Sequence, residues 1–457
     1  MRRWGPASVA GLAFGFAALW VGVGPDDGNW VSFLAQLAGA EAVLLMAIAI
    51  VLISVLPAVE TWFDGIDRTA IWHRRLSMTG VLLLIPHLLF ATGQHDHLTP
   101  GSTPPTPGDQ GGGSGGTLAL IGVWGLAALT VWAIAPRWRD MLPWHRVRPI
   151  TPAAGLTAAR WITRACRVVF GNYERWRSLH RLTGMFLAAG FVHGLLDATM
   201  FDSGLLRGSY LLAGGTGLVF YLYRETLARH FLPLHDYQVT AARPAGPGIL
   251  ELELAPLGRP MHFTPGQFAM LFLETTDGWR RHPFTMSGAP ADGTLTFAIK
   301  ALGDDTTRIH HTVQPGMPAV IGGPHGRFDH ARGTDRQVWI AGGIGVTPFL
   351  SWLRSLEHRP SHARVDFFYA TTGPAPFADE ITRIADGNPG VHVHLHDTTD
   401  RGYLTAADVL DAVRDTDPRQ LSVFLCGPAP MVAAFLRQFR RAGIPARHLH
   451  REHFDWR

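Results

Sequence analysis

The chain has 457 residues, of which 47% are hydrophobic, and it carries 40 Lys and Arg against 36 Asp and Glu. This length exceeds one ordinary domain, and the two cysteines, Cys166 and Cys426, exclude a disulfide framework and a thiolate metal site. The mean hydropathy of +0.10 averages two unlike halves, which meet near residue 230.

Six apolar segments occupy the N-terminal half, and each is close to the roughly 20 residues that a membrane-spanning helix needs. They lie at about residues 6–24, 35–56, 73–92, 117–135, 180–197 and 205–223. The first follows Met1-Arg2-Arg3 but is long and lacks a small-residue cleavage site, so we expect an anchor rather than a signal peptide. The fifth is the weakest because it carries Asp197. The pattern predicts an all-α, six-helix transmembrane domain over residues 1–230.

Charge asymmetry predicts the orientation of these segments. Residues 136–181 contain ten Arg against Asp140 and Glu174, whereas residues 93–116 contain no Lys or Arg. The positive-inside rule then places both ends of the chain in the cytoplasm of a multi-pass inner or plasma membrane protein, with the Gly/Pro-rich loop outside. The pI near 9.4 therefore reflects membrane topology and lipid contact rather than nucleic-acid binding.

Four histidines lie at matched depths in two of these segments: His73 and His87 in the third, His180 and His193 in the fifth. At about 1.5 Å rise per residue, both separations are roughly 20 Å and fit within a bilayer core of about 30 Å. Side by side, the segments offer His73 with His180 and His87 with His193 as axial ligands of two stacked b-type hemes. The absence of a CxxCH tract makes that binding non-covalent. The alternative for each is a packed or hydrogen-bonded membrane histidine.

The angular fit of the two segments differs. Fourteen residues return almost to one helix face, but 13 fall short, so we expect a kink or bulge near Gly184 or Gly190. Arg74 and Arg75 flank His73 and are candidate partners of heme propionates, or simply positive-inside flanks.

The external loop holds His95, Asp96 and His97, which are candidate metal ligands. The alternative is an ordinary polar loop, since three close polar residues more often bind nothing.

The C-terminal half changes to short alternating strands and then to a repeated strand, Gly-rich turn and helix. Strands are predicted at residues 237–241, 248–254, 267–273 and 294–300. They indicate an antiparallel β-barrel over residues 231–332, and the later repeat indicates an α/β Rossmann-like nucleotide-binding domain over residues 333–457. After the strand at residues 338–341, glycines let the backbone approach a pyrophosphate, and a helix beginning near Pro348 offers its free N–H groups.

Four motifs carry a specific resemblance. They are His282-Pro-Phe-Thr-Met-Ser-Gly288, Ala341-Gly-Gly-Ile-Gly-Val-Thr-Pro348, Leu425-Cys-Gly-Pro428 and Glu452-His-Phe454. In this order they resemble the flavin and pyridine-nucleotide motifs of the ferredoxin-reductase superfamily, in the form carried by NADPH oxidases and ferric reductases. The spacing of the four histidines also resembles the membrane domain of those oxidases and reductases.

The resemblance implies a role for each matching residue. His282, Pro283, Phe284, Thr285 and Ser287 would line FAD, with Lys300 and Thr306 at its pyrophosphate. Gly342, Gly343, Gly345, Thr347, Pro348, Gly427 and Pro428 would bind NADPH or NADH.

Two further residues would act near the hydride path. Phe454 would cover the flavin until nicotinamide displaces it, with Trp456 as the reserve candidate. Cys426 would flank the path of the hydride, and its alternative is a small buried residue at a strand end.

Two departures from the family pattern affect specificity. After the strand ending at Tyr369, relatives that bind NADPH often carry an Arg where this chain has Thr371 and Thr372, and Arg401 is the substitute candidate. Ala91 stands where animal oxidases carry another His, which weakens an oxygen-reducing role.

The resemblance implies a transmembrane oxidoreductase that passes electrons from NAD(P)H through FAD and two b-type hemes to an extracytoplasmic acceptor, either a ferric chelate or O₂. FAD would convert two-electron into one-electron chemistry. The rival interpretation is an electron-transfer subunit that feeds a partner protein or quinone.

Overall fold

The structure is a computed structural model that describes residues 4–24, 29–54, 56–91, 114–134, 173–196, 203–228, 234–275, 278–289, 292–358 and 362–452. Contacts divide the chain into two compact units, Met1–Asp64 with Arg68–His230 and Gly65–Asp67 with Phe231–Arg457. The predicted roles of Phe454, Trp456, His95 and His97 fall outside the described residues.

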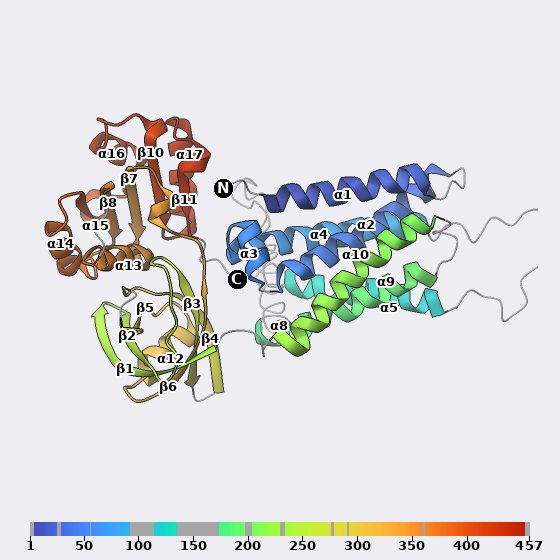
Figure 1. Cartoon of the computed structure of the whole chain (residues 1–457), viewed down its shortest axis with the longest axis horizontal. Coiled ribbons are helices and arrows are strands. Elements are labelled where there is room, and N and C mark those ends of the chain that lie inside the picture. The colour runs from blue at the N-terminus through green and yellow to red at the C-terminus, as the bar shows by residue number, and fades with distance from the viewer. Residues whose placement is uncertain are drawn as a thin grey trace, which may run out of the picture. The chain divides into compact units, whose positions relative to one another are not determined.

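The first unit is helical, and each of the six predicted apolar segments contains a helix (Figure 1). The helices are α1 (Trp4–Val23), α2 (Trp30–Leu52), α3 (Pro57–Phe63), α4 (Ile66–Ala91), α5 (Ser114–Ile134), α8 (Tyr173–His180), α9 (Thr183–Leu196), α10 (Gly204–Leu222) and the π-helix η5 (Tyr223–Leu227). Among the described residues, three helices are long and apolar enough to cross a membrane: α1, α2 and Gly115–Ala133 within α5.

Helix α2 forms much of the buried interior of this unit. Asn29 caps it by accepting hydrogen bonds from the N–H groups of Val31 and Ser32. Small residues along α2 allow close helix packing, and its Ala47 lies where a side chain at Gly217 of α10 would clash. The helix therefore provides a scaffold on which the histidine-bearing helices pack.

The second unit begins with an antiparallel barrel. Its elements are β1 (Leu234–Gly246), β2 (Ile249–Pro256), β3 (Phe268–Thr275), β4 (Gly278–Thr285), β5 (Leu295–Lys300), α12 (Asp304–Thr312) and β6 (Pro318–His325). The strand order is β4-β3-β6-β1-β2-β5, and a bridge from Met286 to Phe297 joins the two ends of the sheet. The four predicted strands are confirmed. Strands β4 and β6 were not predicted, because a Pro interrupts each and neither has simple alternation.

A parallel sheet of order β11-β10-β7-β8-β9 follows the barrel, as the repeat of strand, turn and helix predicts. Its elements are η6 (His330–Arg332), β7 (Arg336–Gly342), η7 (Gly343–Val346), α13 (Thr347–Leu356), β8 (Arg364–Thr371), α14 (Ala378–Asp386), β9 (Val391–Asp397), α15 (Thr398–Arg401), α16 (Ala406–Ala412), η8 (Pro418–Gln420), β10 (Leu421–Cys426), α17 (Ala429–Arg441), η9 (Ala446–His448) and β11 (Leu449–Arg451).

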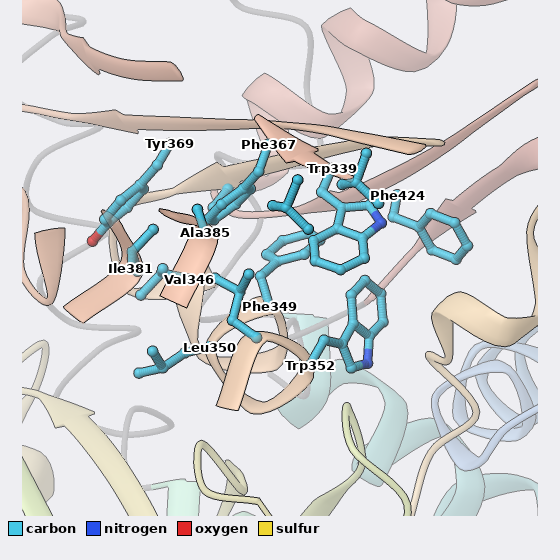
Figure 2. Close-up of a cluster of buried hydrophobic side chains, with 14 of the residues drawn as sticks. Trp339, Val346, Phe349, Leu350, Trp352, Phe367, Tyr369, Ile381, Ala385 and Phe424 are labelled. Atoms are coloured by element: carbon cyan, nitrogen blue, oxygen red, sulfur yellow. The ribbon is translucent and has the colours of Figure 1, made fainter. Parts of the chain in front are cut away.

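Alternate residues of β7 face two hydrophobic clusters on opposite sides of the sheet. Trp339 packs with Phe349, Trp352 and Phe367 in the cluster of Figure 2. Val338 and Ile340 face the other cluster, with helices α16 and α17. Because successive strand residues point to opposite faces, a sheet covered on both sides needs an apolar strand such as β7.

Candidate functional site

Two pairs of histidines meet across the helices of the first unit. The ring centroids of His73 and His180 are 6.3 Å apart, and those of His87 and His193 are 6.4 Å apart. An iron between two imidazoles needs about 2 Å to each nitrogen, which lies about 1 Å from its ring centroid, so the centroids should be about 6 Å apart. Both pairs therefore fit an axial ligand set for a heme.

Hydrogen bonds orient three of the four rings. The Nδ1 atom of His73 lies 2.9 Å from the Ala49 carbonyl oxygen, and Nδ1 of His87 lies 3.0 Å from that of Ala35. The hydroxyl of Thr183 lies 3.3 Å from Nδ1 of His180. A partner on Nδ1 fixes the direction of the ring and favours metal binding through Nε2. Within the described residues, Nδ1 of His193 is buried without a hydrogen-bond partner.

The helix break in the second histidine segment lies near Gly184, one of the two predicted places. It falls at residues 181–182, between α8 and α9, whereas Gly190 lies inside α9. The Thr183 hydroxyl donates to the His180 carbonyl oxygen, and Arg181 forms an ion pair with Glu225 of η5. This turn adjusts the angle between His180 and His193, which a continuous helix would not bring to one face.

Glycines create the space around the outer pair, His87 and His193. Both rings line one cavity between α2, α4, α5 and α9. A Cβ atom at Gly39 would lie 2.5 Å from the His87 ring, and one at Gly122 would lie 3.1 Å from the Phe186 carbonyl oxygen. A side chain at Gly39 or Gly122 would therefore clash with its neighbours. The missing side chains leave space for the two histidines.

The predicted propionate partners lie on the surface. Arg74 and Arg75 are exposed, and the Arg75 guanidinium lies 5.4 Å from the centroid of the Trp72 ring. Trp176 stacks on the His180 ring at a centroid distance of 4.7 Å. The described structure thus supports the His180 ring by stacking, while both arginines remain accessible.

Strand β4 presents the predicted flavin motif. It pairs with β3 so that His282, Pro283, Phe284 and Thr285 stand opposite Leu271, Met270, Ala269 and Phe268. Thr285 is 3% exposed, and its hydroxyl has no partner among the described residues. A buried hydroxyl is costly without a hydrogen bond, so this position fits a ligand that supplies one. A flavin ring has polar edge atoms of that kind.

The other predicted flavin residues shape the surrounding backbone. The Ser287 hydroxyl donates to the Thr296 carbonyl oxygen, which holds the segment after β4 against β5. Thr306 accepts hydrogen bonds from the N–H groups of Leu302 and Gly303, and so caps α12. Lys300, the candidate phosphate cation, is the last residue of β5. By capping α12, Thr306 therefore positions the loop between β5 and α12.

The predicted nucleotide loop lies at the carboxyl end of β7. Gly343 has a φ of 56°, in the left-handed region that favours glycine. A Cβ at Gly345 would lie 2.5 Å from the Cys426 carbonyl oxygen, and one at Gly342 would lie 2.9 Å from Pro428. The two nucleotide motifs thus touch backbone to backbone where the strand order reverses between β7 and β10, next to Thr347 and Pro348 at the start of α13.

Cys426 ends β10 as a fully buried residue next to Gly427, and its thiol donates to a carboxylate oxygen of Glu452 at 3.7 Å. Burial is the main cause that raises its pKa well above the usual value, and the negative charge of Glu452 raises it further. The thiol is therefore protonated at neutral pH, and in this form it is a poor nucleophile.

A carboxylate lies beside the loop where NADPH-binding relatives carry an Arg. Asp397 ends β9 and accepts hydrogen bonds from the N–H groups of Gly373 and Thr399. Thr372 lies within 3.0 Å of the Thr398 hydroxyl, whereas Arg401 ends the short helix α15. Asp397 was not predicted from the sequence, although an acidic residue at a strand end beside a nucleotide loop is a recognisable signal.

Helix α13 joins the nucleotide loop to the barrel. Its Arg354 donates to Glu251 of β2, to both oxygens of Glu380 and to the Ser287 carbonyl oxygen. Ser351 donates to the Gly288 carbonyl oxygen at 2.7 Å. Arg354 was not predicted either, because its partners are distant in the sequence.

Comparisons with known proteins match this part of the chain. An FAD-binding domain family matches residues 235–346, and an oxidoreductase NAD-binding domain family matches residues 339–437. The chain is 31% identical over 227 residues to the ferredoxin–NAD(+) reductase component of an alkene monooxygenase system from Xanthobacter autotrophicus, covering 46% of this chain and 67% of that protein.

Two further relatives are named as parts of oxygenase systems. The chain is 30% identical to the reductase component of propane 2-monooxygenase from Rhodococcus jostii, covering 47% of this chain and 62% of that protein. It is 27% identical to the electron transfer component of anthranilate 1,2-dioxygenase from Acinetobacter baylyi, covering 45% of this chain and 62% of that protein. The chain thus spans somewhat less than two thirds of the length of most of these relatives. Through its FAD-binding and NAD-binding domains, the chain belongs to the ferredoxin–NAD(+) reductase family of oxidoreductases.

Proposed function

We propose that this protein is a transmembrane flavocytochrome that takes electrons from NAD(P)H through FAD to two b-type hemes and on to an acceptor beyond the membrane. The two histidine pairs carry the proposal, because their separations of 6.3 and 6.4 Å match two axial ligand sets. Hemes held there would carry single electrons between the flavin and the acceptor.

The C-terminal unit supplies the binding groups for the electron donor and the flavin. Thr285 offers a hydroxyl to the flavin ring, and the glycines after β7 receive the pyrophosphate of the nucleotide. Cys426 and Glu452 form one wall beside these motifs. We expect the residues of this unit to exclude water from the hydride path by close packing around both ligands.

The acceptor has two candidate classes. A ferric chelate or O₂ suits an iron with both axial positions filled, because such an acceptor is reduced at the heme edge. The relatives, however, are named as reductase components of oxygenase systems, which favours delivery to a partner protein instead. A partner acceptor keeps the same donor and flavin, and changes only the last step.

The proposed location is an inner or plasma membrane, with both ends of the chain in the cytoplasm. Helices α1 and α2 and the Gly115–Ala133 part of α5 have the length and hydropathy of membrane spans. The Arg-rich stretch 136–181 belongs on the cytoplasmic side by the positive-inside rule. NAD(P)H would then bind on the side where it is made.

Heme content and its dependence on the histidines test this proposal. We expect about two hemes per purified chain, and loss of one heme in either His87→Ala or His193→Ala. NADH should still bleach the flavin in both variants, because they leave the C-terminal unit unchanged. His392→Ala, an exposed histidine of β9, is the control and should keep both hemes. Fewer than two hemes in the unaltered protein would contradict the proposal.

The acceptor is tested with protein that carries both hemes. Reduction of a ferric chelate under argon would support the reductase, and superoxide formed by the purified protein alone would support the oxidase. Heme reduction that continues to neither acceptor until a membrane extract is restored would favour the partner-feeding alternative.

A further inference from the structure

A groove on the helical unit contains a carboxyl group in an otherwise apolar setting. Its volume is about 350 Å³, and α1, α2 and α4 form its walls. The lining residues are Ala17, Leu34, Ala38, Glu41, Leu83 and three further apolar residues of α1 and α2. Glu41 is the one ionisable residue among them.

Glu41 is only 9% exposed, and its Oε1 atom has no hydrogen-bond partner among the described residues. A buried carboxylate without a partner is costly, so the group is expected to be a neutral carboxylic acid. A neutral acid offers one O–H donor and one carbonyl acceptor to a ligand in the groove. The other lining side chains are apolar and can contact only the apolar part of a ligand.

The groove lies beside the outer histidine pair. On α2, Ala35 accepts the hydrogen bond of His87, and Gly39 packs against the same ring. Leu34 and Ala38, which line the groove, are their immediate neighbours on that helix. On α4, Leu83 lies one turn before His87. The groove and the outer histidine pair therefore use neighbouring faces of α2, about 100° apart around the helix.

We propose that this groove binds a lipid-soluble quinone, with Glu41 at a carbonyl oxygen of its ring. The inference rests on the proposed function and names the chemical class of its acceptor. An apolar groove disfavours a charged ferric chelate, whereas a quinone combines an apolar tail with two hydrogen-bonding oxygens. A quinone also enters a membrane protein from the side, between helices.

Reduction of the quinone gives Glu41 a second role, because the carboxyl donates a proton as well as a hydrogen bond. A quinone becomes a quinol by taking two electrons and two protons, one proton at each carbonyl oxygen. NAD(P)H supplies both electrons along the proposed path and is oxidised to NAD(P)⁺. The Glu41 carboxyl gives its proton to the quinone oxygen that it contacts, the other oxygen takes its proton from water, and water then reprotonates Glu41.

Binding is tested with a photoreactive azidoquinone on the full-length protein in detergent. We expect label on α1 or α2, removed by excess decylubiquinone. Ala17→Phe, which fills the groove, should abolish this label, and so should Glu41→Leu. Gly15→Phe is the matched control, because a side chain there meets open space on the same helix. Label elsewhere, or label that Ala17→Phe leaves unchanged, overturns the inference.

The rate of quinone reduction tests whether Glu41 donates a proton. Glu41→Gln keeps the shape and hydrogen bonds of the side chain but has no acidic proton, so labelling should persist while NAD(P)H-driven reduction of decylubiquinone falls at least about tenfold. Reduction of a hydrophilic ferric chelate should stay within about twofold of the unaltered protein, because the electron carriers are unchanged. Equal quinone reduction by Glu41→Gln and the unaltered protein overturns the role of Glu41.

Failure of the quinone site and failure of the proposed function would give different experimental results. If NAD(P)H reduces the flavin but no heme binds, the proposed function fails, and a competed label in the groove still supports the quinone site. If both hemes are reduced by NAD(P)H and decylubiquinone neither binds nor is reduced, the quinone site fails and the proposed function stands.

Discussion

The thiol of Cys426 is fully buried and points to Glu452, and burial is the main reason that its pKa lies well above the usual value. Because the thiolate is the reactive form, we expect iodoacetamide to leave Cys426 unmodified in the native protein at about pH 8. A Cys166→Ser variant makes Cys426 the single cysteine. Mass spectrometry should then find no label before denaturation and one label after it. Rapid labelling of the native variant would contradict the buried, protonated thiol.

Asp366 on β8 gives a pH-dependent contribution to stability. It is 4% exposed and accepts hydrogen bonds from His394 at 2.8 Å and Arg336 at 2.5 Å. Burial opposes its charge, but these hydrogen bonds and the charge of Arg336 outweigh burial and hold its pKa below the usual value. With a folded pKa below the unfolded value of about 3.9, the stabilisation is complete above that value and is lost as the pH falls through the folded pKa.

We therefore expect Asp366→Asn to lower the free energy of unfolding by about 2–4 kcal/mol at pH 7, because it leaves Arg336 without its buried partner. The temperature at which the flavin is released reports this loss. The difference from the unaltered protein should shrink below about pH 4, where the carboxylate itself becomes protonated. Asp411→Asn, which changes an exposed carboxylate, is the control. A deficit that stays constant down to pH 3 would mean that shape rather than charge matters at this position.

At the scale of elements, we expect the ends of β8 and β9 to determine the preference between NADH and NADPH. The N–H of Gly373 donates a hydrogen bond to the Asp397 carboxylate and holds it in place. A negative charge therefore faces the loop that would receive the adenosine ribose. A carboxylate accepts from a 2′-hydroxyl and repels a 2′-phosphate. We expect NADH to be preferred over NADPH.

Asp397→Ser should raise the efficiency with NADPH relative to NADH by roughly tenfold. Steady-state rates of flavin-dependent oxidation of the two nucleotides measure the ratio. Arg401→Ala should change this ratio of NADPH to NADH efficiency by no more than about twofold, because we expect Arg401 to make no contact with the nucleotide phosphate. A preference for NADPH that disappears in Arg401→Ala would instead assign that contact to Arg401.

Helix α13 couples the two ligand sites of the C-terminal unit. Its first turn follows the nucleotide glycines, and Arg354 near its end binds Glu251, Glu380 and the carbonyl oxygen of Ser287. Replacing Arg354 leaves two partly buried carboxylates facing each other without a cation.

We expect Arg354→Ala to slow hydride transfer to FAD at least about tenfold while flavin remains bound, because the relative position of the two sites loosens. Arg354→Lys should recover little, since one ammonium cannot reproduce the forked contacts. Stopped-flow bleaching of the flavin measures the rate, and Arg383→Ala, which removes an exposed ion pair from the neighbouring α14, is the control. A normal rate in Arg354→Ala would restrict this residue to stability.

At the scale of the whole molecule, the helical unit exposes apolar side chains that water would not tolerate in such number. Phe14 is 78% exposed, Trp30 74% and Leu212 73%. We expect such a surface to lie against lipid. We expect the full chain to stay in the membrane pellet after an alkaline carbonate wash and to require detergent for extraction. Release by carbonate alone would contradict an integral membrane location.

The sequence by itself determined most of the elements, because their signals are local. Apolar runs predicted the helices, alternation predicted four barrel strands, and the glycines after β7 predicted the nucleotide turn. It also placed four histidines at matched depths. Strands β4 and β6 escaped prediction, because proline and glycine interrupt their patterns and their pairing comes from neighbouring strands.

Only the tertiary structure decided which side chains meet. The turn at residues 181–182, the buried hydroxyl of Thr285, the contacts of Arg354 and the position of Asp397 each depend on how distant elements pack. The unpartnered carboxyl of Glu41 is of the same kind, because its burial depends on α1 and α4 as well as on its own helix. Local periodicity sets the face on which a residue lies, but contacts between residues distant in the sequence arise only from the arrangement of those faces in space.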